Sequence, residues 1–186
     1  MTVFRDLSQH ILDIAENGIN ANASCLYIDI IEDLEEDQLT IHIRDDGHGM
    51  DAELLSRIVD PWVTSRTTRN VGLGIPFLKQ TAEMCGGSFT ITSQPQKGTS
   101  IRAVFQHSHI DRPPLGDVVS TILCLIVGYQ DVNFTHHHQV AGREFNFDTV
   151  EIHEVLGDEV PLSDPDVLSY IRQTLEDGWQ TLHMNA

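Results

Sequence analysis

The segment RDDGHGMDAE contains residues whose types and spacing could bind a flat, amine-bearing ring. Asp45 ends an apolar alternating run, and its carboxylate could accept a hydrogen bond from an exocyclic amine such as that of adenine. Gly47 and Gly49 have no side chains, so they would admit a flat ring against the backbone. Asp-Gly pairs are also common in ordinary strand-to-helix turns, so this segment alone does not separate a binding site from a loop.

A second pair of polar residues lies in DIAEN, where Asp13 and Asn17 are four residues apart and share one face of an expected helix. A carboxylate and a carboxamide in this arrangement suit a magnesium ion, which takes a few oxygen ligands and keeps several waters. The alternative is a helix surface that carries a polar stripe.

Two further segments contain glycines next to an expected helix or strand. In TSRTTRNVGLGIPF, Gly72 and Gly74 precede an expected helix, whose first backbone amides favour anions, and Arg66 would neutralise further charge. In KGTSIRAVF, Gly98 and Thr99 begin a strand. Each segment also has a plain interpretation, the first as a surface loop and the second as a turn.

The elements that must position these residues follow from periodicity. Helical spacing or length predicts helices over 4–22, 51–58 and 74–85, and alternation predicts strands over 25–33, 38–46, 88–94 and 99–105. This order predicts a two-layer α/β (α+β) fold, with helices on one face of a mainly antiparallel sheet.

A proline-marked break, HSHIDRPPLGD, separates this part from the rest of the chain. We expect one domain over 1–108 and a small C-terminal α+β module over 115–186. That module is predicted to contain a helix over 116–128, a hairpin of strands 131–139 and 144–155 turning at Ala141-Gly142, and a helix over 165–177 capped by Asp164.

The run HHHQ in the first strand of that hairpin invites a metal interpretation. On a strand, His136 and His138 share a face and His137 points the other way. His136 should pair with Phe147, and His153 should lie off this patch, so no third ligand is in register. The sequence therefore favours a solvated hairpin face over a metal site.

Composition excludes several classes of function. A formal net charge of -17 repels nucleic-acid phosphates and anionic lipid, so we expect neither a nucleic-acid nor a membrane partner. The longest apolar run, VVSTILCLIVGY, is too short to span a bilayer, and no leader pattern is visible. Three widely spaced cysteines are typical of reduced thiols, so a cytoplasmic location is expected.

Taken in order, the segments resemble motifs of the GHKL superfamily, which comprises gyrase-type topoisomerases, heat-shock chaperones, histidine kinases and mismatch-repair ATPases. DIAENGINANAS resembles that family's N box, DDGHGM its DxGxG box, DPWVTSRT the F-box region of kinases and GLG the second glycine box. GGSFTITSQPQKGTSIRAVF resembles the closing segment with its Gly-Thr. The resemblance covers about residues 4–106 and implies a Bergerat fold, which binds ATP between a sheet and a mobile lid.

The resemblance also implies roles for individual residues. Asn17 would coordinate the magnesium ion that bridges the phosphates, and Asp45 would bind the adenine amine with support from Thr99. Further contacts to the nucleotide are implied for Ala21, Gly47, Gly49, Met50, Arg66, Gly72, Leu73 and Gly74.

The sequence departs from the family pattern at Asp13. Hydrolytic members and serine kinases have Glu at this position, and sensor histidine kinases usually have Asn. Asp13 as general base is therefore a hypothesis, because Asp is one methylene shorter than Glu and general-base geometry tolerates little error. His10, one turn earlier, is interpreted as a helix-face histidine and not as a phosphoacceptor.

Three functions remain open. The first is a cytoplasmic regulatory protein that binds ATP and magnesium and transfers the terminal phosphate to a partner protein. The second is an ATP-dependent conformational switch with slow or no hydrolysis, and the third is a protein-interaction module with a degenerate nucleotide site. A homodimer is compatible with each of them.

Overall fold

The computed structural model describes residues 5–58, 74–157 and 160–184 of the 186-residue chain. The helices are α1 (Leu7–Asn20), α2 (Ala52–Ile58), α3 (Gly74–Met84), α4 (Val118–Gly128), α5 (Thr149–Leu156) and α6 (Pro165–His183). The strands are β1 (Cys25–Asp33), β2 (Gln38–Asp45), β3 (Ser88–Gln94), β4 (Gly98–Gln106), β5 (Asn133–Val140) and β6 (Arg143–Asp148). None of the described helices is long and apolar enough to cross a bilayer.

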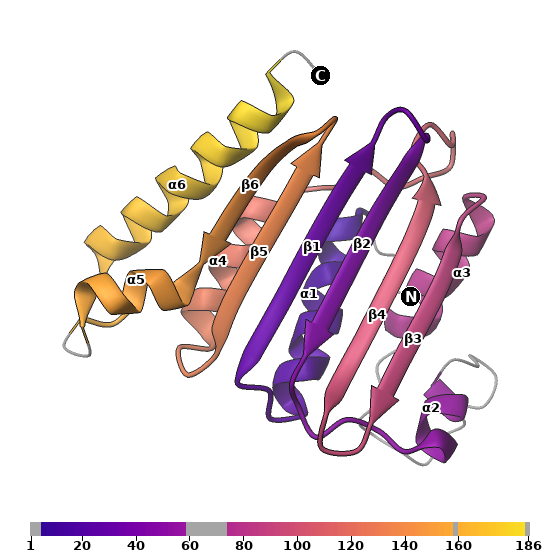
Figure 1. Ribbon diagram of the computed structural model, residues 1–186, viewed down its shortest axis with the longest axis horizontal. Helices are drawn as coiled ribbons and strands as arrows, with labels where there is room; N and C mark the ends of the chain where they lie inside the picture. Colours follow the sequence, from indigo (N-terminus) through magenta and orange to yellow (C-terminus); the bar gives the residue numbers. More distant parts are fainter. Residues whose placement is uncertain (1–4, 59–73, 158–159, 185–186) are drawn as a thin grey trace.

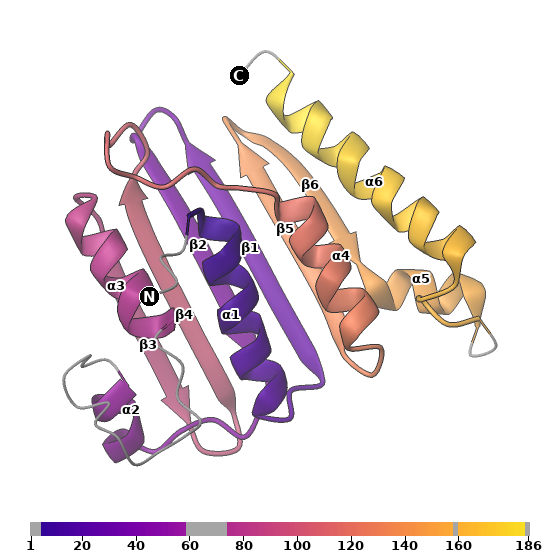
Figure 2. The same ribbon diagram turned by 180° about the vertical axis from the view of Figure 1, so that it is seen from behind.

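All of these strands belong to one sheet with the order β3-β4-β2-β1-β5-β6. Within the described residues, the pairing of β1 with β5 is parallel and the other pairings are antiparallel. Helices α1, α3 and α4 cover one face of the sheet, as Figure 2 shows, whereas Figure 1 looks onto the opposite face. The predicted two-layer fold with helices on one face of a mainly antiparallel sheet is therefore confirmed.

The core lies between this sheet and the helices, because apolar residues alternate along each central strand. Leu26, Ile28 and Ile30 of β1 are buried, and Ile41 of β2 and Phe105 of β4 lie on the same face. Burying a side chain of this size stabilises the fold by about 1.5–3 kcal/mol.

The C-terminal elements extend the same sheet. Strand β5 pairs with β1 along its whole length, from Cys25 opposite Asn133 to Glu32 opposite Val140. Buried residues of α4, β5 and α6 belong to the same apolar cluster as those of α1 and β1. The predicted break coincides with the connection between β4 and α4, and a division of the chain into two domains there remains a prediction.

The predicted strand over 144–155 is wrong in its second half. Strand β6 ends at Asp148, whose side chain accepts a hydrogen bond from the Val150 backbone N–H at 2.8 Å and caps helix α5. An N-cap of this kind outweighed the strand preference of the β-branched residues that follow it. Helix α6 begins as predicted, with Asp164 as its cap and Pro165 as its first residue, but it continues to His183.

Candidate functional site

A cavity of about 670 Å³ lies between α1, the end of β2, the start of β4 and the start of α3. This volume is within the range of pockets that hold a nucleotide-sized ligand. Six of the residues predicted to bind nucleotide line the cavity: Asn17, Ala21, Asp45, Gly49, Met50 and Thr99. Apolar side chains, among them Ile43, Leu54 and Ile75, form much of the remaining wall. The structure thus brings together three segments that are far apart in the sequence.

Asp45 occupies the last position of β2, opposite Thr99 of β4. Its Oδ1 accepts a hydrogen bond from the Gly47 backbone N–H at 2.9 Å. Burial raises the pKa of the Asp45 carboxyl, and hydrogen bonds from the backbone of Gly47 and Thr99 oppose this rise. The carboxylate is therefore positioned by backbone groups at the cavity wall.

Close packing around Asp45 depends on residues without side chains. A Cβ added at Gly18 of α1 would lie 2.9 Å from the Asp45 Cβ, and one added at Gly47 would lie 2.8 Å from the Ala21 carbonyl oxygen. Gly18 was not predicted as a site residue, and its position one residue after Asn17 in the expected helix was the only signal for it. Because these two residues have no Cβ, α1 can lie directly against the end of β2.

A small polar network anchors the loop after β2 to the β3–β4 hairpin. The Met50 backbone N–H donates to the Ser93 Oγ at 2.8 Å, and Ser93 Oγ lies 3.0 Å from Thr99 Oγ1. Ser93 was missed because it has no place in the motifs, although the hairpin turn over 95–97 already sets it opposite Thr99. The network fixes the side of the cavity where Gly49 and Met50 lie.

Asp13 and Asn17 meet as the helical spacing predicted, with the Asn17 amide nitrogen donating to Asp13 Oδ2 at 3.3 Å. Asp13 does not line the cavity but lies against the start of α3, where a Cβ added at Gly74 would be 1.8 Å from its Oδ2. Burial raises the pKa of the Asp13 carboxyl, the hydrogen bond from Asn17 lowers it, and the charge of Glu16 raises it. Arg66, Gly72 and Leu73 lie outside the described residues.

The residues present fit a magnesium ion at Asn17. Because the amide nitrogen faces Asp13, the amide oxygen of the planar carboxamide points away from Asp13, and Asn17 lines the cavity. An uncharged oxygen donor beside a phosphate-sized space is the kind of ligand that magnesium takes while keeping waters.

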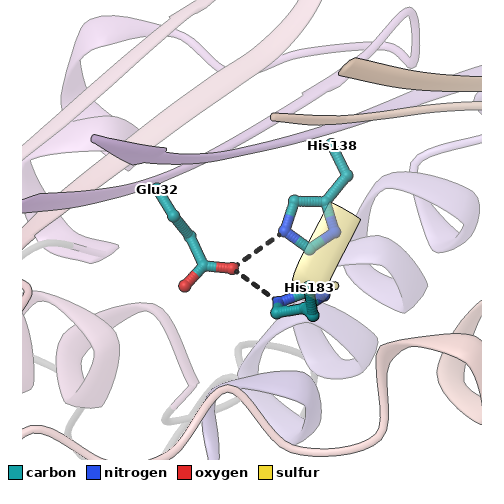
Figure 3. A group of neighbouring side chains, drawn as sticks. All are labelled: Glu32, His138 and His183. Carbon is teal, nitrogen blue, oxygen red and sulfur yellow. Dashed lines mark hydrogen bonds and ion pairs between the residues drawn. The ribbon is translucent and has the colours of Figure 1, made fainter. Parts of the chain in front are cut away.

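The prediction of a solvated face for His136 and His138 is wrong. His136 is opposite Phe147, as predicted, but both histidines face the helices, where they are 4% and 1% exposed. The His136 ring donates through Nδ1 to the Ile28 carbonyl at 3.0 Å, and burial lowers its pKa to about 3. His138 contacts Glu32 of β1 and lies near His183 of α6 (Figure 3), two residues that the pattern within one hairpin did not reveal.

The sequence profile described as "Histidine kinase-, DNA gyrase B-, and HSP90-like ATPase" matches residues 2–109. The match covers more than half of the chain, so the protein belongs to this ATPase family. The nucleotide-binding fold and the family expected from the sequence motifs are thereby confirmed.

Curated relatives are sensor and sporulation kinases. The chain is 32% identical to sporulation kinase D of Bacillus subtilis (strain 168) over 95 residues, 51% of this chain and 19% of that kinase. It is 26% identical to sporulation kinase A of the same organism over 99 residues, 53% of this chain and 16% of that kinase. The chain thus spans less than a fifth of the length of these relatives.

Solved structures show the same fold at low identity. The MutL ATPase domain of Aquifex aeolicus complexed with ADP matches with a TM-score of 0.51 and 12% identity, over 92% of this chain and 88% of that one. The N-terminal domain of a DNA repair protein matches with a TM-score of 0.53 and 15% identity, over 84% of this chain and 58% of that one.

Proposed function

We propose that the protein binds ATP with magnesium in the cavity beside Asp45 and transfers the terminal phosphate to a partner protein. The observation that carries the nucleotide part is the placement of Asp45. Its carboxylate is held by the Gly47 backbone at the wall of a cavity of about 670 Å³, among apolar side chains that can contact a purine ring. A fixed acceptor in such a pocket selects a ring that carries an amine.

Asn17 would hold the magnesium ion through its amide oxygen. Magnesium, when bound, supplies charge neutralisation for the phosphates. The hydrogen bond to Asp13 keeps the Asn17 amide nitrogen on the Asp13 side, which leaves the amide oxygen available to the ion. The start of α3, at Gly74 and Ile75, adds backbone amides and the positive end of the helix dipole.

Asp13 is our candidate for the general base, with the partner's hydroxyl or imidazole as the group that it would assist. Its raised pKa favours proton uptake, and Gly74 leaves room for its carboxylate at the start of α3. Phosphotransfer fits the kinase relatives, and the partner is a separate protein in this proposal. A cytoplasmic location and a homodimer are parts of the same proposal.

An ATP-dependent switch without turnover is the second candidate. It is favoured by the location of Asp13, which lies behind Asn17 and outside the cavity wall. Binding of ATP would then change the position of α3 and of the β4–α4 connection, and no phosphate would be transferred.

The test uses purified protein, magnesium and ATP labelled at the terminal phosphate, with Asn17→Ala and Asp13→Asn beside the wild type. We expect magnesium-dependent ATP binding in the wild type and in Asp13→Asn, and its loss in Asn17→Ala. Label transferred to a protein from a cell extract by the wild type but not by Asp13→Asn supports the kinase. Tight binding by the purified wild type that leaves ATP intact, with no label transferred in the extract, supports the switch. Absence of nucleotide binding would overturn both.

A further inference from the structure

A second polar site lies at the opposite end of the sheet from the nucleotide cavity. Glu32, near the end of β1, is opposite Leu39, whereas Asp45 is opposite Leu26. Glu32 and Leu26 are six positions apart along β1, about 20 Å at the rise of a strand. The site therefore shares no residue with the cavity.

Three histidines surround the Glu32 carboxylate, which is 13% exposed as a side chain. His138 Nε2 of β5 and His183 Nε2 of α6 lie 3.0 Å and 3.3 Å from the same oxygen, Oε1 (Figure 3). His107 Nε2, just after β4, lies 3.0 Å from the other oxygen, Oε2. The Glu32 carboxylate is thus the common partner of three imidazoles, which come from β5, from α6 and from the segment just after β4.

The second nitrogen of His183 sets the tautomer of its neutral ring. His183 Nδ1 is 2.8 Å from the Trp179 carbonyl oxygen, which can only accept, so Nδ1 carries a proton. In the neutral ring Nε2 then has a lone pair, and this lone pair faces a carboxylate oxygen. This nitrogen is the atom that a metal ion would use, and it lies 3.3 Å from Glu32 Oε1.

The spacing of the donors suits a metal ion. The Glu32 oxygen and the ligating nitrogens of His138 and His183 all lie within 4.8 Å of one another. Tetrahedral zinc, with bonds of about 2.0–2.1 Å to nitrogen and oxygen, holds its ligand atoms about 3.3 Å apart. The His183 distance of 3.3 Å matches this spacing and the His138 distance of 3.0 Å is slightly shorter. His183, 31% exposed at the end of α6, has room to adjust.

The surroundings resemble the outer shell of a metal site. A carbonyl oxygen on Nδ1 of a ligating histidine fixes its orientation, and Trp179 has this role for His183. The Trp179 ring also stacks on the His183 ring with centroids 4.2 Å apart. His107 holds the second carboxylate oxygen, which directs Oε1 to the other two histidines.

We propose that Glu32, His138 and His183 bind one zinc ion, with water in the fourth position. Two imidazoles and one carboxylate are a ligand set that zinc takes in proteins. The ion would tie the last turn of α6 to β1 and β5, so zinc would control how firmly the C-terminal helix is held on the sheet. The site is independent of the nucleotide proposal.

The test uses the full chain without an affinity tag, freed of metal by a chelator and titrated with zinc against a chromogenic indicator. We expect one zinc per chain in the wild type. His183→Gln should weaken binding at least about 100-fold, since loss of an outer-shell partner alone costs 10–100-fold. The matched control is His137→Gln, on the same strand but on the opposite face, which should bind as the wild type does.

Two measurements on the wild type keep the test independent of variant folding. Cobalt(II) should give the intense visible bands of a four-coordinate ion, and zinc should abolish them. Zinc in excess should also raise the melting temperature, because it binds the folded chain only. Absence of a stoichiometric zinc site would overturn the proposal, and so would equal weakening by His183→Gln and His137→Gln. Glu32 would then be a polar partner of the three histidines and not a metal ligand.

Discussion

At the residue scale, Asp45 ends β2 as the alternating pattern predicted, and its role as a nucleotide ligand stays a prediction. The alternation of a strand fixes the face on which its last residue lies, and the structure places Asp45 at the cavity wall. What the sequence did not reveal is how it is held, because the Gly47 hydrogen bond and the Gly18 contact depend on how α1 and β2 meet. Arg66, Gly72 and Leu73 remain predictions from the motif.

Asp45→Asn should weaken ATP and ADP binding about 10- to 100-fold, the effect of losing a hydrogen bond to a charged group. Because the Gly47 N–H keeps the amide oxygen on its side, the new amide nitrogen would face the adenine amine, donor against donor. Calorimetric titration measures the affinity, and GTP binding should not fall. Asp46→Asn is the control, since it removes the same charge from an exposed neighbour. Equal losses in both variants would contradict the role of Asp45.

His10 should make the fold sensitive to acid. It is 3% exposed in α1, and burial lowers its pKa from 6.5 to about 4, against the opposing charge of Asp6. The unfolded chain then binds more protons than the folded chain, so the free energy of unfolding falls as pH decreases from about 6.5 to about 4. The loss should approach about 3 kcal/mol, at 1.36 kcal/mol per pKa unit.

Urea unfolding of the wild type and of His10→Gln at pH 7.5, 5.5 and 4.5 measures this effect. Their difference in stability should shrink as the pH falls, because only the wild type carries the imidazole. A difference that is constant over this range would show that His10 does not contribute to the acid sensitivity.

At the element scale, periodicity and caps predict where most helices and strands lie in the sequence. They do not predict which of these elements lie side by side in the fold. Alternation and the Ala141-Gly142 turn predicted the β5–β6 hairpin and its register, including His136 opposite Phe147. Nothing local indicates that β5 pairs in parallel with β1, so the burial of His136 and His138 and the contact of His138 with Glu32 were not predictable. The end of β6 was misplaced because the Asp148 cap was not recognised.

The loop between β2 and α2 should tolerate no side chain at Gly49. This residue has a φ of +62°, and an added Cβ would lie 2.0 Å from the Gln94 carbonyl oxygen. Gly49→Ala should therefore lower the free energy of unfolding by about 2 kcal/mol or more, because backbone strain and a backbone clash add. Gly142→Ala is a matched control, with a φ of +81° but open space around the added Cβ, and should cost about 1–2 kcal/mol at most.

Thermal and denaturant unfolding of both variants test this difference. Equal destabilisation would mean that the loop can move away from the β3–β4 hairpin. In that case the contact between Met50 and Ser93 should also be dispensable, and Ser93→Ala should leave nucleotide binding unchanged.

At the scale of the whole molecule, one sheet joins strands between residues 25 and 148, and one apolar cluster includes residues from Leu7 to Leu175. We therefore expect a single cooperative unfolding transition, with equal calorimetric and van't Hoff enthalpies. Scanning calorimetry at neutral pH, without nucleotide or metal, measures both quantities. Two resolved transitions would instead support a division into domains near residues 108–115.

The place of β5 beside β1 also has a consequence for aggregation. In the order β3-β4-β2-β1, strand β1 would be an outer strand of nine residues, paired with β2 on one edge and unpaired on the other, with a Leu-Ile-Ile row along one face. Such an edge is a template for another chain's strand. The C-terminal hairpin covers this edge and so prevents β1 from pairing with a strand of another chain. A chain cut after residue 109 should form β-rich oligomers, which light scattering and thioflavin fluorescence would reveal, whereas the full chain should not.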